Sequence, residues 1–250
     1  MARSPARTVA VGVEGGRVTA TFKNGLLRST LAEELARLGR LQLWLKVAYS
    51  AYVAIVVPCY WVTYTPWNFL YFCDIAMLTT APALWLESSL LVSMQTISIA
   101  MPQLLWVVDL LCRLMLGIHV TGVTAYMLDP SLSLPLRLLS SFHGWLPFLL
   151  LWLTWRLGYD SRAFAAQSVV AVVVLLVSYA FAPAPPPSPS APHAAVNINY
   201  VYGLKDDHPQ TWIAPHLWVL TVLAVNLLVF CRPTHLALRR WFPSAAAQAR

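Results

Sequence analysis

The stretch FAAQSVVAVVVLLVSYAFAP, residues 164–183, is twenty residues long and contains no charged side chain. A helix of about 20 apolar residues is long enough to cross the roughly 30 Å hydrocarbon core of a bilayer. Further apolar segments of this kind lie at residues 47–64, 67–87, 90–112, 114–128, 138–157 and 212–231. The sequence therefore predicts an all-α fold, a polytopic bundle of transmembrane helices.

The composition agrees with a membrane protein and argues against other classes. Of the 250 residues, 58% are hydrophobic and 11% are charged, whereas about a quarter of the residues in a soluble domain are charged. The net charge of +7 comes from basic residues that flank the apolar core, which favours membrane lipid over nucleic acid as the partner. The four cysteines have no metal-binding spacing, and we find no phosphate-binding or dinucleotide motif, so we expect neither a metal nor a cofactor.

Composition divides the chain into four parts. Residues 1–28 contain VAVGVEGGRVTATF, whose alternation of apolar and polar residues predicts a short β-hairpin, with a disordered extension as the alternative. Residues 29–46 carry apolar residues at helical spacing and predict an amphipathic helix at the membrane interface. The transmembrane domain covers residues 47–231, with a Pro-rich and Asn/Tyr-rich outer loop over 182–211, and residues 232–250 form a basic cytoplasmic tail.

The segment LMLGIHVTGVTAYML, residues 114–128, is the weakest candidate for a membrane span because it is short and contains two glycines. If this segment re-enters the membrane or lies at its surface, six spans remain and both termini lie on one side. Basic residues favour that arrangement, because of all 17 only Arg113, Arg137 and Lys205 then lie outside the cytoplasm. We expect six spans in a bacterial inner membrane with both termini in the cytoplasm, and seven spans are the alternative.

Ionisable side chains within the apolar segments are the first candidates for function, because each costs several kcal/mol in a membrane unless it is paired or hydrated. These residues are Cys73, Asp74, Asp109, His119 and His143. In the six-span arrangement, Cys73 and His143 lie at a similar depth, about 8 to 9 Å below the outer ends of their helices. Asp74 and Asp109 also have a structural alternative, which is hydrogen bonding between helices.

A cysteine and a histidine at one depth suit acyl transfer. An imidazole at His143 would remove the proton of the Cys73 thiol, and a carboxylate such as Asp74 would orient the imidazole. Supporting or substrate-binding roles are predicted for Asp109, His119, Asn197, Asn199 and Tyr200, where amides of the outer loop would stabilise an oxyanion. Two alternatives stay open, a small transporter with Asp74, Asp109 and His119 along an ion path, and a non-catalytic membrane scaffold.

Three stretches resemble the YwaF family of integral membrane proteins, which includes a eukaryotic transmembrane acyltransferase of ether phospholipids. They are FCDIAML at residues 72–78, DPSLSLPLRLLSSFHGW at 129–145 and NINYVYG at 197–203. The resemblance implies a polytopic helical fold in which Cys73 accepts the acyl group and His143 acts as its base.

Two further resemblances are weaker. The chain is distantly similar to the androgen-induced membrane hydrolases, which use threonine and histidine on fatty-acid esters, and this likeness would bring Thr63 or Thr65 into the site. The segments WLES, FHGWLP, LGYD and NINYVYG also resemble an uncharacterised bacterial group of membrane-associated proteins.

Overall fold

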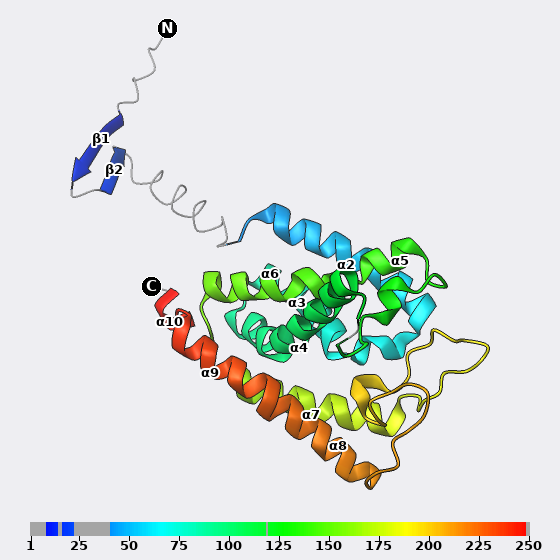
Figure 1. The fold of residues 1–250 in the computed structure, drawn as a ribbon. Helices are drawn as coiled ribbons and strands as arrows, with labels where there is room; N and C mark the ends of the chain where they lie inside the picture. Colours follow the sequence, from blue (N-terminus) through cyan, green and yellow to red (C-terminus); the bar gives the residue numbers. More distant parts are fainter. Residues whose placement is uncertain (1–8, 15–16, 23–40, 119, 249–250) are drawn as a thin grey trace. The chain divides into compact units, whose positions relative to one another are not determined.

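The computed structural model describes residues 9–14, 17–22, 41–118 and 120–248, and the chain divides into two compact units, Met1–Leu43 and Trp44–Arg250. In the first unit, β1 (Val9–Glu14) pairs with β2 (Arg17–Phe22) as an antiparallel hairpin in the region where the sequence alternates. Residues 29–40 of the predicted amphipathic helix lie outside the described residues. The second unit is helical and carries every described candidate for function (Figure 1).

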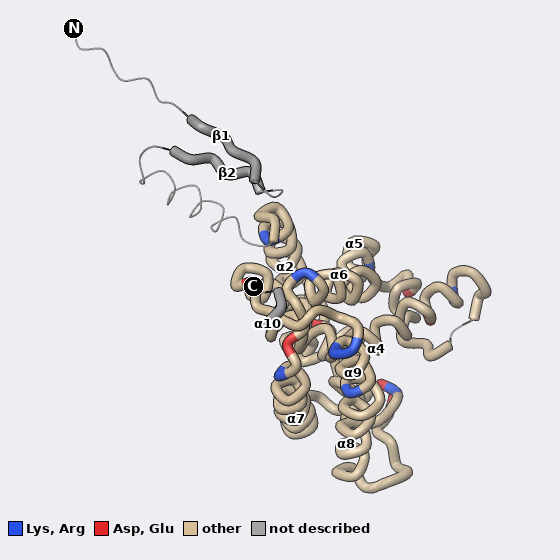
Figure 2. Tube along the Cα trace, turned by 90° about the vertical axis from the view of Figure 1, so that its left-hand side faces the viewer, with Lys and Arg blue, Asp and Glu red and all other residues tan. Residues whose placement is uncertain are grey.

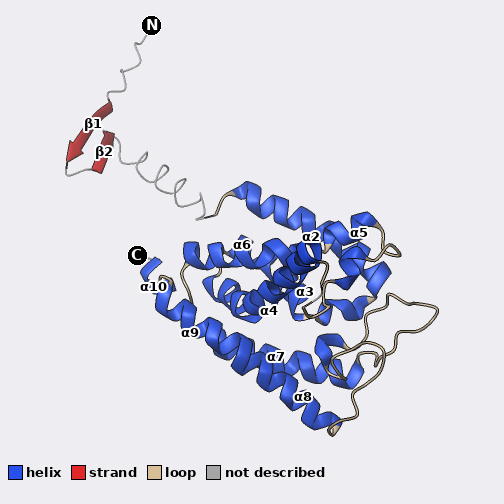
Figure 3. Cartoon of the chain, viewed as in Figure 1, coloured by secondary structure: helices blue, strands red, loops and turns tan. Residues whose placement is uncertain are grey.

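The second unit begins with α2 (Leu43–Tyr64), followed by a 3₁₀ helix (Pro66–Leu70) and α3 (Phe72–Leu86). The remaining helices are α4 (Ser89–Leu116), α5 (Leu134–Leu139), α6 (Phe142–Leu157), α7 (Ala163–Phe181), α8 (Pro215–Ala224), α9 (Arg232–Trp241) and α10 (Ala245–Gln248). A π-helical segment, Val225–Cys231, joins α8 to α9, so these form one long helix (Figure 3).

Five of these helical stretches are long and apolar enough to cross a membrane, and α3 is a shorter apolar helix. The spanning stretches are α2, α4, α5 with α6, α7, and α8 through α9. Figure 2 shows long parts of the helical trace without Lys, Arg, Asp or Glu. The predicted all-α, polytopic bundle is confirmed, and the chain is an integral, multi-pass membrane protein.

The segment at residues 114–128 does not form a helix that could span a membrane in its described part. Helix α4 continues into it as far as Leu116 and ends at Gly117, whose φ of 73° is favourable for glycine. Beyond the helix end, a loop leads to a short 3₁₀ helix, Ala125–Leu128. This agrees with the prediction that the segment does not cross the bilayer.

Hydrogen bonds group the helix ends into two faces of the bundle. At one end, Lys46 Nζ lies 2.8 Å from Glu87 Oε1, and Asp160 N donates to Ser93 Oγ at 3.0 Å. The C-terminal segment joins this end, because Tyr159 N donates to Pro243 O at 2.7 Å. We call this end the basic face, since Lys46, Arg156, Arg162, Arg239 and Arg240 lie at its helix ends.

The opposite end, the loop face, carries the connections 65–71, 117–133 and 182–214. Ala195 N donates to Tyr64 O at 2.8 Å, and Asn199 Nδ2 donates to Leu70 O at 2.8 Å, so the third connection packs on the first. The helix ends thus alternate between two faces in the order that six passes require.

Helix α4 is the centre of the bundle and packs against α3, α6, α7 and α9. Its contact with α6 includes a buried hydroxyl pair, Thr96 Oγ1 and Thr154 Oγ1, at 2.7 Å. In contrast, Val169, Val173 and Leu176 on α7 are more than half exposed, as expected for side chains that face lipid.

Candidate functional site

The first turn of α3 carries Cys73 and Asp74 at the loop face. The Asp74 side chain is buried, with 2% of the residue exposed. Its Oδ2 accepts hydrogen bonds from Asn68 Nδ2 at 3.2 Å and from Cys73 Sγ at 3.6 Å. Its Oδ1 has no hydrogen-bond partner among the described residues. One oxygen of a buried carboxyl group is therefore left for another donor.

The outer loop holds this turn in place through Asn199. Asn199 Oδ1 accepts from Phe72 N at 3.1 Å, and its Nδ2 donates to Leu70 O, so the side chain caps the start of α3. Asn199 adopts a left-handed conformation with φ of 54°, which asparagine tolerates better than most residues. The Asn199 amide is thus engaged with the protein backbone and acts as a support for Cys73 and Asp74.

Asn197 and Tyr200 shape the same loop. Asn197 Oδ1 accepts from Tyr202 N at 2.8 Å, and its Nδ2 donates to Gly203 O at 2.9 Å. Tyr200 O accepts from Trp218 Nε1 at 2.8 Å, which ties the loop to α8. The predicted oxyanion donors of this segment are used to hold the loop against its neighbours.

His143 lies in the first turn of α6, and its neighbours select its tautomer. Its Nδ1 lies 2.9 Å from Ser140 O, and because a carbonyl oxygen can only accept, Nδ1 carries the proton. In the neutral ring, Nε2 is then the hydrogen-bond acceptor. The ring stacks on Trp106 with centroids 5.3 Å apart and an interplanar angle of 25°, which fixes its orientation.

Tyr126, which the sequence analysis did not single out, lies beside the histidine. Its ring centroid is 6.4 Å from that of His143. Burial raises the pKa of Tyr126 far above its usual value, so the hydroxyl stays protonated. Trp106 Nε1 lies near this hydroxyl, yet neither atom has a hydrogen-bond partner in the described part of the chain.

Asp109 positions Tyr126 by organising the loop that precedes it. Asp109 is fully buried near the end of α4, and Oδ1 accepts from Thr121 N at 2.6 Å and Gly122 N at 3.1 Å. Oδ2 accepts from Thr124 N at 3.2 Å and Thr124 Oγ1 at 2.5 Å. These contacts join Asp109 to the loop after its own helix and not to another helix, while His119, the other candidate of this region, lies outside the described residues.

The structure brings the three predicted catalytic residues, Cys73, Asp74 and His143, to the same face of the bundle, but among the described contacts it shows no hydrogen bond from His143 to Cys73 or to Asp74. The thiol of Cys73 donates to Asp74, and the hydrogen bond of the His143 ring is to Ser140. Among the described residues, no group of three or more His, Cys, Asp or Glu side chains could hold a metal ion.

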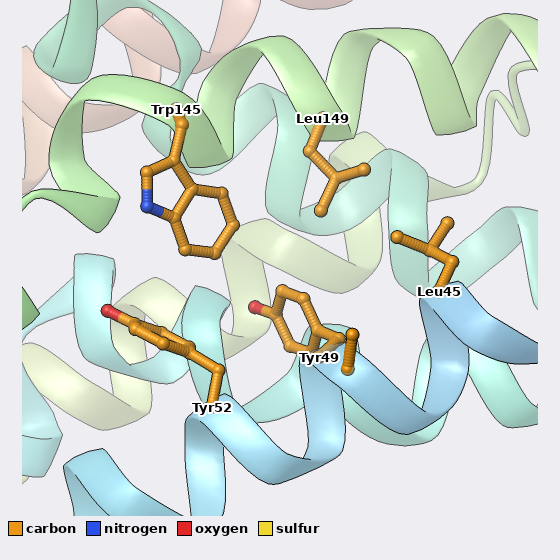
Figure 4. Close-up of a pocket in the computed structure, with 6 residues that line it drawn as sticks. Leu45, Tyr49, Tyr52, Trp145 and Leu149 are labelled. Atoms are coloured by element: carbon orange, nitrogen blue, oxygen red, sulfur yellow. The ribbon is translucent and has the colours of Figure 1, made fainter.

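An open groove runs between α2 and α6 (Figure 4). It has a volume of about 370 Å³ and is lined by Leu45, Ala48, Tyr49, Tyr52, Trp145 and Leu149. The tyrosine hydroxyls donate to backbone carbonyls, Tyr49 to Met77 O at 2.9 Å and Tyr52 to Leu139 O at 2.5 Å. The surface left to the groove is therefore mainly aliphatic and aromatic carbon.

Comparisons of this chain with protein-family models, with curated proteins and with solved structures find no match. The geometry of the site is the basis for assigning a function.

Proposed function

We propose that this membrane protein is a lipid acyl hydrolase or acyltransferase, with Cys73 as the nucleophile and His143 as the general base. The observation that carries this proposal is the tautomer of His143, whose Nε2 is the acceptor, beside the rings of Trp106 and Tyr126. A base next to an N–H and an O–H donor suits a reaction that takes a proton from a nucleophile and places negative charge on a carbonyl oxygen.

In the proposed reaction, the Cys73 thiol exchanges its hydrogen bond with Asp74 for one with His143 Nε2, which removes its proton. The thiolate attacks the ester carbonyl, and Tyr126 O–H and Trp106 N–H donate to the resulting oxyanion. The carbon–oxygen bond of the ester breaks, His143 returns the proton to the leaving alcohol, and an acyl thioester remains on Cys73. Water or a second lipid alcohol then takes the acyl group and restores the thiol.

The groove between α2 and α6 supports a lipid as the substrate. The groove lies on the α2 side of α6, the helix whose first turn carries His143, and it continues along α2 toward Leu45. A carbon-lined groove within the membrane-spanning region favours an acyl chain, because each methylene group buried is worth about 0.8 kcal/mol.

Orientation in the membrane follows from the distribution of basic residues. The basic face carries Lys46, Arg156, Arg162, Arg239 and Arg240, whereas the loop face has three basic residues, so we assign the basic face to the cytoplasm. A reporter that is active only in the cytoplasm, fused after Arg240, is expected to be active. Activity of a periplasmic reporter at that position would instead place the Cys73 site on the cytoplasmic side.

Selective acylation of Cys73 tests the proposed function directly. The full chain in lipid nanodiscs is treated with an alkyne-tagged lipid analogue that carries an activated ester, and the modified cysteine is identified by peptide mass spectrometry. We expect the label at Cys73 and at least about ten times less at Cys59 and Cys112, which have no role in the proposed reaction but have the same intermediate exposure. Equal labelling of the three would favour the non-catalytic scaffold.

A further inference from the structure

The proposed base, His143, lies directly after a break between two helices. Helix α5 ends at Leu139, and α6 begins three residues later. Within the break, His143 N donates to Ser140 O at 3.3 Å. The next amide, Gly144 N, donates to Ser141 O at 2.8 Å. In a continuous α-helix these two amides would bond to Leu139 O and Ser140 O, so the break leaves both carbonyl oxygens accessible to side-chain donors.

Side chains bond to both of these oxygens. Ser140 O accepts from Nδ1 of the His143 ring at 2.9 Å, the contact that leaves Nε2 as the acceptor. Leu139 O accepts from the Tyr52 hydroxyl at 2.5 Å. Because Tyr52 belongs to α2, a neighbouring helix supplies the hydrogen bond that Leu139 O loses at the break.

A second tyrosine of α2 reaches the same break. Tyr60 Oη lies 2.5 Å from Ser140 Oγ, and both residues are 2% exposed. Ser140 Oγ donates to Leu136 O at 3.4 Å, since a carbonyl oxygen can only accept. The single proton of the serine hydroxyl is thus directed to Leu136, and Tyr60 is the donor to Ser140. Tyr52 and Tyr60 lie roughly 12 Å apart along α2 and bond to adjacent residues of the break.

We propose that Tyr52 and Tyr60 are positioning residues for His143. Their hydroxyls hold the break between α5 and α6, and the break presents Ser140 O to Nδ1 of the imidazole. This inference rests on the proposed function, in which His143 is the general base for Cys73. Only the neutral ring with its proton on Nδ1 can accept the thiol proton at Nε2, so the two tyrosines keep the base in its productive form.

The tautomer of His143 tests this inference without a measurement of acylation. Full-length protein with isotope-labelled histidine nitrogens is studied by NMR in lipid nanodiscs, at a pH where the ring is neutral. The signals of His143 are those that disappear in His143→Phe. In Tyr52→Phe/Tyr60→Phe, which removes both hydroxyls and keeps both rings, a signal of protonated Nε2 is expected. The ratio of Nδ1-protonated to Nε2-protonated ring should fall about tenfold, as expected when two hydrogen bonds are lost.

Tyr49→Phe is the matched control. Tyr49 lies on the same helix and is 4% exposed, and its hydroxyl also donates to a backbone carbonyl, Met77 O, at 2.9 Å. Met77 belongs to α3, so this bond does not reach the break. We expect the signals of His143 to stay unchanged in Tyr49→Phe. The proposal would be overturned by unchanged signals in the double variant, or by an equal change in Tyr49→Phe, which would indicate a general packing effect.

Ser140→Ala provides a second test if the double variant does not elute as folded protein. This change removes the hydroxyl that Tyr60 contacts and keeps the backbone carbonyl at position 140. It should also lower the ratio of the two tautomers. Tyr60→Phe combined with Ser140→Ala should lower the ratio no further than the stronger of the two single changes, because both remove the same contact. An unchanged ratio in Ser140→Ala would contradict the proposal.

Acylation of Cys73 separates this inference from the proposed function. If the original protein is not acylated at Cys73, the proposed function is wrong, and the NMR result still decides whether the tyrosines control the His143 tautomer. If acylation requires His143 but the double variant keeps both the original tautomer and the original rate, only the positioning role is wrong. We expect the double variant to acylate Cys73 about tenfold more slowly, in proportion to the loss of the productive tautomer.

Discussion

Replacing His143 by Phe is expected to lower the rate of Cys73 acylation by about 100-fold or more, the usual contribution of a general base. The Phe ring preserves the stacking on Trp106, so the packing at the start of α6 is retained while Nε2 is removed. The rate is measured with the alkyne-tagged ester in nanodiscs, as a time course of modified Cys73 peptide.

The control for this experiment is His208→Phe, because His208 lies on the same loop face but is exposed and paired with Asp207. It is expected to acylate at the unchanged rate. The dependence of the acylation rate on pH separates catalysis from packing. The original protein should acylate faster than His143→Phe at neutral pH, and this difference should disappear at low pH, where His143 is protonated. A His143→Phe protein that acylates as fast as the unchanged protein would remove His143 from the mechanism.

The helices were largely predictable from the sequence because side chains that contact lipid must be apolar. The predicted helix ends differ from the observed ones where prolines, caps or charged residues determine the local backbone. The apolar segment at 67–87 starts within the 3₁₀ helix Pro66–Leu70, and α3 begins only at Phe72, where Asn199 caps it. The last helix continues to Trp241, because the arginines of α9 alternate with buried Thr234 and Leu238 and leave an apolar side for the bundle.

The candidate site was predictable only in part. The order of the spans was enough to place Cys73 and His143 at one face, since that needs only the topology and the rise of a helix. Tyr126 could not be found this way, because its place depends on how the loop after α4 folds onto Asp109. Trp106 was missed because its contact with His143 depends on which face of α4 packs against α6. The sequence also could not show that Asn199 caps α3 and does not act as an oxyanion donor. This role depends on the tertiary fold, because its contact with Phe72 joins residues 127 positions apart.

Changing Asp109 to Ala is expected to destabilise the protein by roughly 3 kcal/mol and to remove acylation of Cys73. The carboxylate accepts hydrogen bonds from three backbone amides and one hydroxyl, and its loss leaves these donors of residues 121–124 without the acceptor that orients them. The loop then no longer holds Tyr126 beside His143. Stability is measured as the denaturant midpoint in detergent, and acylation as above.

The matched control for Asp109 is Asp129→Ala, which removes a carboxylate from the same connection. Asp129 also accepts from a backbone amide and a hydroxyl, those of Ser131 at 2.8 and 2.7 Å, but this pair is exposed to solvent. Water can replace its hydrogen bonds, so the midpoint is expected to stay unchanged. Asp109→Asn, which retains one acceptor oxygen, should fall between the two. If Asp109→Ala lost acylation while keeping full stability, Asp109 would act in the reaction itself, and the loop-anchoring explanation would be wrong.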